Sequence, residues 1–146
     1  MNEYQKVVED LRKYKGLKVF IQNAKELIEL YNQDNSGIKA ITYDSINLKT
    51  NNVGSSVESK AVNKKDNTER LEKKIREAQS IIDKIDRSLE ILNEIDKKIL
   101  ILKYMDGQPW FKIASEVSMS ERQCKRNRNK SIKRLIIPFF GNSERG

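Results

Sequence analysis

Histidine is absent from this chain of 146 residues, and cysteine occurs once, at Cys124. Without histidine, neither a Ser-His nor a Cys-His catalytic pair can form, and the sequence has no zinc-ligand spacing. The single cysteine excludes an internal disulfide and is typical of proteins from a reducing compartment. Only two prolines and six glycines are present, and this scarcity favours long helices.

Long apolar runs are missing as well. No stretch approaches the roughly 18 apolar residues of a membrane span, and the segment MNEYQKVVEDLRKYKG lacks the apolar core of a signal peptide. The sequence contains no phosphate-binding loop and no dinucleotide fingerprint. We therefore expect a soluble, cytoplasmic protein that has no membrane partner, holds no cofactor or metal and is not an enzyme.

Positive charge is in excess, and it is concentrated in one part of the chain. The formal net charge is +8, and from Arg122 to Arg134 there are seven Lys or Arg and no acid. Residues 122–146 hold eight bases and one acid, and hence +7 of the total. A basic block beside a mixed-charge body suggests a polyanionic partner on one face. The alternative is a solvated surface that keeps the protein soluble.

Apolar residues at steps of three and four predict one long helix over residues 2–32, with Gly16 as a point where it can bend. Residues 33–55 are rich in Asn, Ser, Thr and Gly, which predicts a loop with a short extended piece at Ile38–Tyr43.

The helical period returns in the middle of the chain. A coiled-coil seam predicts a helix from about Val57 to Leu92, capped by Ser55 or Ser56; the seam consists of Leu71, Ile75, Ala78, Ile82, Ile85, Leu89 and Leu92. About three heptads are marginal alone. The helix therefore needs a partner, either residues 2–32 in a hairpin or a second copy in a homodimer, and the sequence leaves both open.

A further helix is predicted to follow Asn93, a good N-cap with Asp96 at the position of a capping-box acid. Its apolar positions are Ile95, Ile99, Leu102 and Met105.

The next residues predict a second short helix and a tight turn. Gly107 suits the left-handed residue that ends a helix, and Pro109 suits the first turn of the next helix. Ser118–Met119 are predicted to form the turn. Ser120 is an N-cap for a third, basic helix, with Gln123 where a capping box closes.

The third helix has two faces on a helical wheel. Cys124, Ser131 and Leu135 point inward, and Arg128 lays its stem along the core and sends its head outward. In the DNA major groove, Arg forms paired hydrogen bonds with guanine, and Asn or Gln forms them with adenine. The outward residues assigned to bases are Arg122, Gln123, Arg126 and Asn129, and those assigned to phosphates are Lys125, Lys130 and Lys133. The alternative for each is a solvated helix surface.

The remaining conspicuous residues receive structural roles. Trp110 and Cys124 are expected in the core, with the thiol buried and inert. The apolar run LIIPFF at residues 135–140 is expected to close the core, with a protein-docking patch as the alternative.

Residues 86–135 resemble the fourth region of bacterial sigma factors, and they are more similar still to phage regulators of the RinA and ArpU type. The shared pattern is a leucine-rich segment, followed by an "iL.lkY..g..w..IA" block and a serine-capped basic helix. The pieces YKGLKVFIQN, GIKAITYD and SSVES extend the resemblance upstream. Ser118 stands where many such turns have Gly, and Cys124 where they have Val. The promoter-melting segments of sigma factors are not recognisable.

That resemblance implies activation of late phage genes through promoter DNA and host RNA polymerase. It also places a set of residues on the groove-facing helix, namely Ser120, Arg122, Gln123, Arg126 and Asn129.

The sequence thus predicts an all-α protein in three parts. Residues 1–92 form a helical hairpin or coiled coil, residues 93–140 a sigma-region-four-like helix-turn-helix, and residues 141–146 a flexible tail. The predicted function is a phage or prophage transcriptional regulator that binds double-stranded DNA, with RNA polymerase as a partner and a homodimer as an option. The alternatives are a small terminase subunit for DNA packaging and an adaptor whose basic helix binds an acidic protein.

Overall fold

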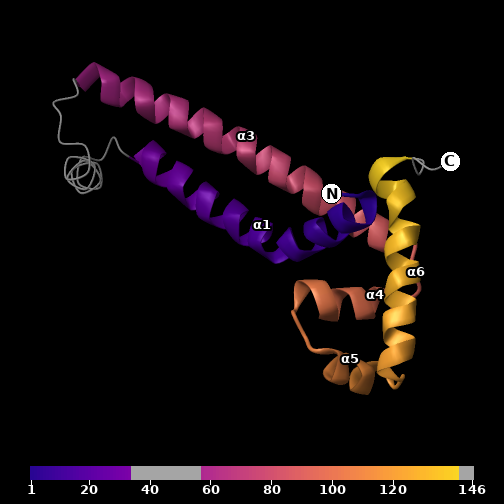
Figure 1. Ribbon diagram of the computed structural model, residues 1–146. Helices are drawn as coiled ribbons and strands as arrows, with labels where there is room; N and C mark the ends of the chain where they lie inside the picture. Colours follow the sequence, from indigo (N-terminus) through magenta and orange to yellow (C-terminus); the bar gives the residue numbers. More distant parts are fainter. Residues whose placement is uncertain (34–56, 142–146) are drawn as a thin grey trace. The chain divides into compact units, whose positions relative to one another are not determined.

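The computed structural model describes residues 1–33 and 57–141, and of residues 57–64 it describes the backbone alone. Every regular element in these ranges is helical, in the order α1 (Glu3–Asn32), α3 (Val57–Leu89), α4 (Glu94–Leu100), η2 (Ile101–Met105), α5 (Trp110–Val117) and α6 (Glu121–Phe140) (Figure 1). The all-α prediction and its long N-terminal helix are confirmed for this part of the chain. Nearly all of the predicted loop, the piece at Ile38–Tyr43, the cap at Ser55 or Ser56 and residues 142–146 lie outside the described residues.

The helices follow the sequence signals closely. α1 is one helix of 30 residues that runs through Gly16. α3 ends at Leu89, three residues before the expected end, because the chain turns at that point with Ile91 N–H donating to the carbonyl of Ser88 at 3.2 Å. None of the described helices is long and apolar enough to cross a membrane.

The chain divides into two compact units, and the boundary differs from the one expected near Asn93. The first unit comprises Met1–Lys18 and Gln79–Gly146, and the second comprises Val19–Ala78. Each unit therefore holds part of α1 and part of α3. The helix break at Asn93 is present, but it falls inside the first unit, since residues on both sides of it share one core.

The main core of the first unit is assembled from four stretches of the chain. Its buried members are Val7 and Leu11 of α1, Ile85 and Leu89 of α3, Leu92, Leu100, Tyr104, and Ile132, Leu135 and Phe139 of α6. The last part of the α3 seam is thus covered by α1 from the same chain, as the hairpin interpretation predicts. Burial of these large aliphatic side chains stabilises the unit by about 1.5–3 kcal/mol each before entropy is counted.

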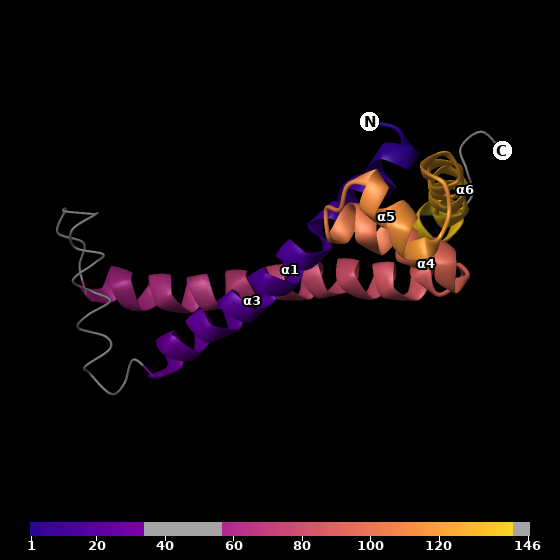
Figure 2. The same ribbon diagram turned by 90° about the horizontal axis from the view of Figure 1, so that it is seen from below.

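A second, smaller cluster joins the three C-terminal helices. Ile99 of α4, Ile113 of α5 and Cys124 of α6 are each fully buried. Figure 1 shows α4 and α5 beside the N-terminal half of α6, and Figure 2 shows both helices on one side of it. One side of α6 therefore packs against this cluster, and its opposite side faces outward.

In the second unit, Ile21, Ala24 and Ala78 are buried, and Leu71 and Ile75 are half-buried. Among the side chains that the structure describes in this unit, Val19 and Leu30 of α1 are large, apolar and exposed.

Two apolar predictions need correction. Ile95 was expected on the inward stripe, but it is 49% exposed, because the first turn of α4 borders an open groove instead of the core. The run LIIPFF closes the core only in part. Leu135 and Phe139 are buried, whereas Ile137 and Phe140 are exposed, because α6 continues as a helix through Pro138 and turns them outward.

Candidate nucleic-acid interface

The segment between α5 and α6 is a tight turn with a left-handed residue. Ser118 has φ 57° and ψ 45°, and Met119 N–H donates to the carbonyl of Ala114 at 3.1 Å. Gly107 takes φ +67° at the end of the preceding helix, as expected. Pro109 is the N-cap of α5, so this helix begins at Trp110, one position after the predicted start. Ser118 therefore adopts the conformation for which many such turns use glycine.

The start of α6 is fixed by a side-chain cap. Ser120 Oγ accepts a hydrogen bond from Gln123 N–H at 3.0 Å. Only this half of the predicted capping box forms, because the Gln123 side chain turns away and donates from Nε2 to Asn127 Oδ1 at 2.8 Å. The cap sets the direction in which the first turn of α6 leaves the turn, and with it the placement of Arg122 and Gln123.

The inward side of α6 is the one that the helical wheel predicts. Cys124, Ser131 and Leu135 are buried. Burial is the main cause that raises the pKa of the Cys124 thiol, and the nearby Glu121 adds to it, so the thiol is held in its unreactive form. Ser131 Oγ is buried without a hydrogen-bond partner.

The outward side of α6 carries the predicted DNA-contacting residues. Arg122, Lys125, Arg126, Asn129, Lys130 and Lys133 are exposed, Ser120 is exposed at the cap, and Gln123 is half-buried. We call this surface the basic face; it consists of Arg122, Gln123, Lys125, Arg126, Asn129, Lys130 and Lys133. These residues come from successive turns of one helix, so the structure brings them together on one surface.

Arg128 departs from its prediction. Its head does not extend outward; Nη1 donates to the Tyr104 hydroxyl at 2.9 Å and Nε donates to Asn129 Oδ1 at 2.7 Å. The guanidinium also lies over the ring of Trp110, 5.0 Å from its centroid. Tyr104 supplies an acceptor and Trp110 a π face, which together hold the half-buried charge near the core.

Trp110 is half-buried against the smaller cluster and gathers positive charge around its ring. Besides Arg128, Lys103 Nζ lies 4.8 Å and Lys125 Nζ 5.9 Å from the ring centroid. Attraction of cations to the ring face is one reason why these like charges can lie close together. The core role expected for Trp110 therefore comes with a second one, the grouping of cations beside the basic face.

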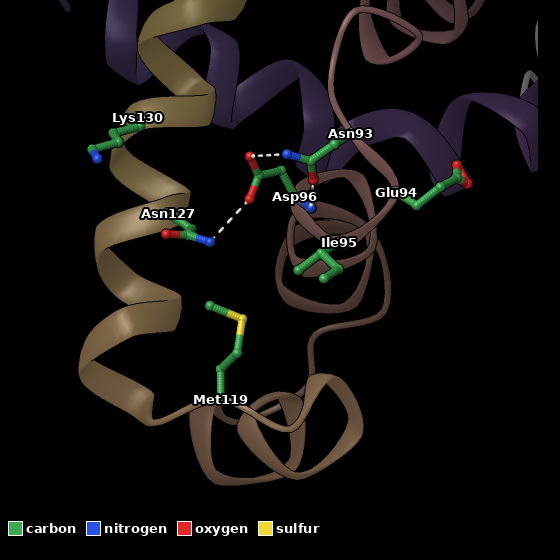
Figure 3. Close-up of a pocket in the computed structure, with 7 residues that line it drawn as sticks. All are labelled: Asn93, Glu94, Ile95, Asp96, Met119, Asn127 and Lys130. Atoms are coloured by element: carbon green, nitrogen blue, oxygen red, sulfur yellow. Dashed lines mark hydrogen bonds between the residues drawn. The ribbon is translucent and has the colours of Figure 1, made fainter.

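A polar relay that the sequence analysis missed connects α4 with α6. Asn127 Nδ2 donates to one carboxylate oxygen of Asp96 at 3.1 Å, and Asn93 Nδ2 donates to the other at 3.2 Å. Asn93 Oδ1 in turn accepts from Asp96 N–H at 2.8 Å, which confirms Asn93 as the N-cap of α4. Figure 3 shows these bonds at the edge of an open groove of about 470 Å³, which Ile95, Met119 and Lys130 also line.

A second missed contact brings α1 to the basic face. The Tyr4 hydroxyl donates to Asn129 Oδ1 at 2.7 Å, across 125 positions of sequence. Partial burial is the main cause that raises the pKa of the Tyr4 phenol, so it stays protonated as a donor. The local sequence around Tyr4 does not predict this contact. The spacing of four between Gln123 and Asn127 does favour the hydrogen bond between those two side chains.

Comparison with known proteins gives a family and no activity. Residues 17–136 match the model of a family described as a protein of unknown function (DUF722). No curated protein and no solved structure matches the chain.

Proposed function

The chain belongs to this family, DUF722, and we propose that it is a sequence-specific transcriptional regulator that binds double-stranded DNA. In this proposal α5, the turn at Ser118 and α6 form a helix-turn-helix, and α6 lies in the major groove. The observation that carries the proposal is the division of α6 into a buried side and a basic face. Of the seven basic residues from Arg122 to Arg134, five belong to that face.

The distribution of charge supports a nucleic acid over a small anion. The exposed bases follow the helix from Arg122 to Lys133, which is eleven residue steps and hence about 16 Å at 1.5 Å per step. A row of that length matches several successive phosphates of a duplex. Lys125, Lys130 and Lys133 are the proposed phosphate contacts, which fix register without reading sequence.

The base readers proposed are Arg122, Gln123, Arg126 and Asn129. Arg122, Gln123 and Arg126 lie in the first two turns of α6, the part of a recognition helix that approaches base edges in helix-turn-helix proteins. The cap at Ser120 and the packing of Cys124 fix the direction of these turns before DNA arrives. A pre-positioned helix loses less side-chain and backbone entropy on binding.

The resemblance to RinA- and ArpU-type regulators extends the proposal. By that resemblance the chain acts in the cytoplasm on phage or prophage late promoters, with host RNA polymerase as a partner. A homodimer is proposed as well, because two copies would double the number of base contacts and read a two-fold symmetric site.

The test is a pair of matched arginine substitutions. Arg126→Ala on the basic face should weaken binding to a selected duplex by about 1–3 kcal/mol and relax base preference at one position. Arg76→Ala removes an exposed arginine from α3 in the second unit, and it should leave affinity and preference unchanged. Fluorescence anisotropy with site variants measures both quantities.

Three outcomes separate the interpretations. Equal weakening on every duplex would make Arg126 a phosphate contact and keep the DNA proposal. Unchanged binding by Arg126→Ala, or equal effects of the two substitutions, would contradict the placement of DNA on α6. Absence of duplex binding by the wild-type chain would contradict the proposed function itself.

A further inference from the structure

Two side-chain amides, Gln123 and Asn129, lie on the basic face. The hydrogen bonds that orient each of them lead to a charged group that can only accept or only donate. An amide has a donor end and an acceptor end, and the major-groove edges of the bases differ in the same two properties. A partner that bonds to one end of the amide turns the other end away from itself, and it removes the bonded end from DNA only when every donor or lone pair at that end is used. The argument rests on the proposed function.

Gln123 is oriented through the relay that ends at Asp96. A carboxylate only accepts, so the Asn127 atom that lies 3.1 Å from it is the nitrogen. Asn127 must then offer its oxygen to Gln123, and the Gln123 atom that meets this oxygen at 2.8 Å is Nε2. The carbonyl end of Gln123 is thereby directed away from Asn127, and Nε2 keeps one further N–H beside it. Figure 3 shows the Asp96 and Asn127 side chains pointing toward one another across the gap between α4 and α6.

Asn129 is oriented in the opposite sense by Arg128. A guanidinium only donates, so the Asn129 atom 2.7 Å from Arg128 Nε is the oxygen. The Tyr4 hydroxyl donates to the same oxygen at 2.7 Å. A carbonyl oxygen has two lone pairs, and these two bonds use both of them. Asn129 can then offer only its N–H groups to DNA.

We propose that these partners preset the base preference of the basic face, so that Gln123 presents its carbonyl acceptor, with one N–H beside it, and Asn129 presents donors alone. Gln123 then selects a base with a major-groove amino group, which is adenine or cytosine. Asn129 selects a base with a major-groove acceptor and does not form the two-bond adenine contact that asparagine can otherwise make. Asp96 and Asn127 are positioning residues, and they act on DNA only through Gln123.

The test compares two acids in the first turn of α4. Asp96→Asn replaces the acceptor-only carboxylate with an amide that can donate or accept, so Asn127 and Gln123 become free to turn over. Glu94→Gln removes the same charge from the same turn, and Glu94 points away from the relay (Figure 3). Each full-length variant is selected against a random-sequence duplex library, and its affinity is then measured for all four bases at the position that Gln123→Ala identifies.

The wild type and Glu94→Gln should prefer adenine or cytosine at that position by at least about fivefold. Asp96→Asn should lose most of this preference. Asn127→Ala breaks the hydrogen bond between Asp96 and residue 127, so it should lose the base preference as well. This second variant keeps the test valid if Asp96→Asn disturbs the start of α4. Retention of the full preference by both variants would overturn the proposal, and so would a wild-type preference for guanine or thymine there.

Asn129→Asp tests the second amide independently. The carboxylate keeps the bonds from Tyr4 and Arg128 and replaces the donor with an acceptor, so the preference for a base with a major-groove acceptor at the Asn129 position should be lost. A general repulsion of phosphates would weaken all four duplexes equally and leave the preference in place, which would overturn the assignment for Asn129. If the wild type bound no duplex at all, the proposed function would fail, whereas DNA binding with unaltered preferences in these variants would refute this inference alone.

Discussion

Leu11→Ala is the substitution that best tests how the first unit is built. Leu11 lies in the first half of α1 and is fully buried in the main core, together with Ile132 and Leu135 of α6. The sequence alone, by contrast, predicts that Leu11 belongs to a separate N-terminal region, residues 1–92. If α1 and α6 share one core, the loss of this side chain should destabilise the C-terminal helices directly.

The magnitude follows from the burial. Replacing leucine by alanine removes three carbon groups at about 0.8 kcal/mol each, and the cavity left behind raises the total to about 2–5 kcal/mol. For a urea dependence of about 2 kcal/mol/M, the midpoint of unfolding should fall by about 1–2.5 M.

The single tryptophan makes the assay specific. Trp110 lies in α5, so its fluorescence reports on the C-terminal helices alone. Urea unfolding followed by this signal should shift for Leu11→Ala and hardly move for Leu30→Ala, which changes a leucine 40% exposed in the second unit. A Trp110 transition that is unchanged by Leu11→Ala would refute the shared core.

Three further predictions concern single groups. Ser131→Ala should leave the free energy of unfolding equal or raise it by up to about 2 kcal/mol, because the buried hydroxyl has no hydrogen-bond partner. A loss above about 1 kcal/mol in urea unfolding would argue against this. Ser118→Gly should raise stability by up to about 1 kcal/mol. Glycine relieves the left-handed conformation, worth about 1–2 kcal/mol, and this gain exceeds the cost of the entropy that glycine adds to the unfolded chain. A fall in Tm would contradict this prediction. Burial and the 2.6 Å bond to Asp86 raise the pKa of Tyr14 above 10.0, so its contribution to stability is complete below pH 10.0 and is lost as pH rises through the folded-state value. Tyr14→Phe should therefore lose less stability than the wild type between neutral and strongly alkaline pH, and equal losses would exclude this role for the phenol.

Local chemistry explains why so much of the helix layout could be predicted. Asn93 and Ser120 cap their helices with short-range bonds to residues three positions on, and such bonds depend only on neighbouring sequence. The inward side of α6 also follows from the helical period alone. The π-helix at Ile101–Met105 has no such signal, and the apolar spacing there predicts an ordinary α-helix.

Contacts between distant residues could not be predicted in the same way. The bond from Tyr4 to Asn129 and the relay from Asp96 to Asn127 depend on how α1, α4 and α6 pack, which periodicity does not reveal. Arg128 shows the same limit, since the wheel places its stem correctly but not the acceptor on Tyr104 that captures its head. The basic face was therefore predictable as a surface, and the orientation of its two amides was not.

The central claim, that α6 presents a row of cations to a DNA duplex, is tested most directly by the salt dependence of duplex binding. Five exposed bases lie on the basic face. If all five neutralise phosphates, the logarithm of the binding constant should fall against the logarithm of salt concentration with a slope of about −4 to −5. Replacing Arg126 and Lys133 together by alanine should bring the slope to about −3. A slope near zero, or one that the double substitution leaves unchanged, would contradict the account.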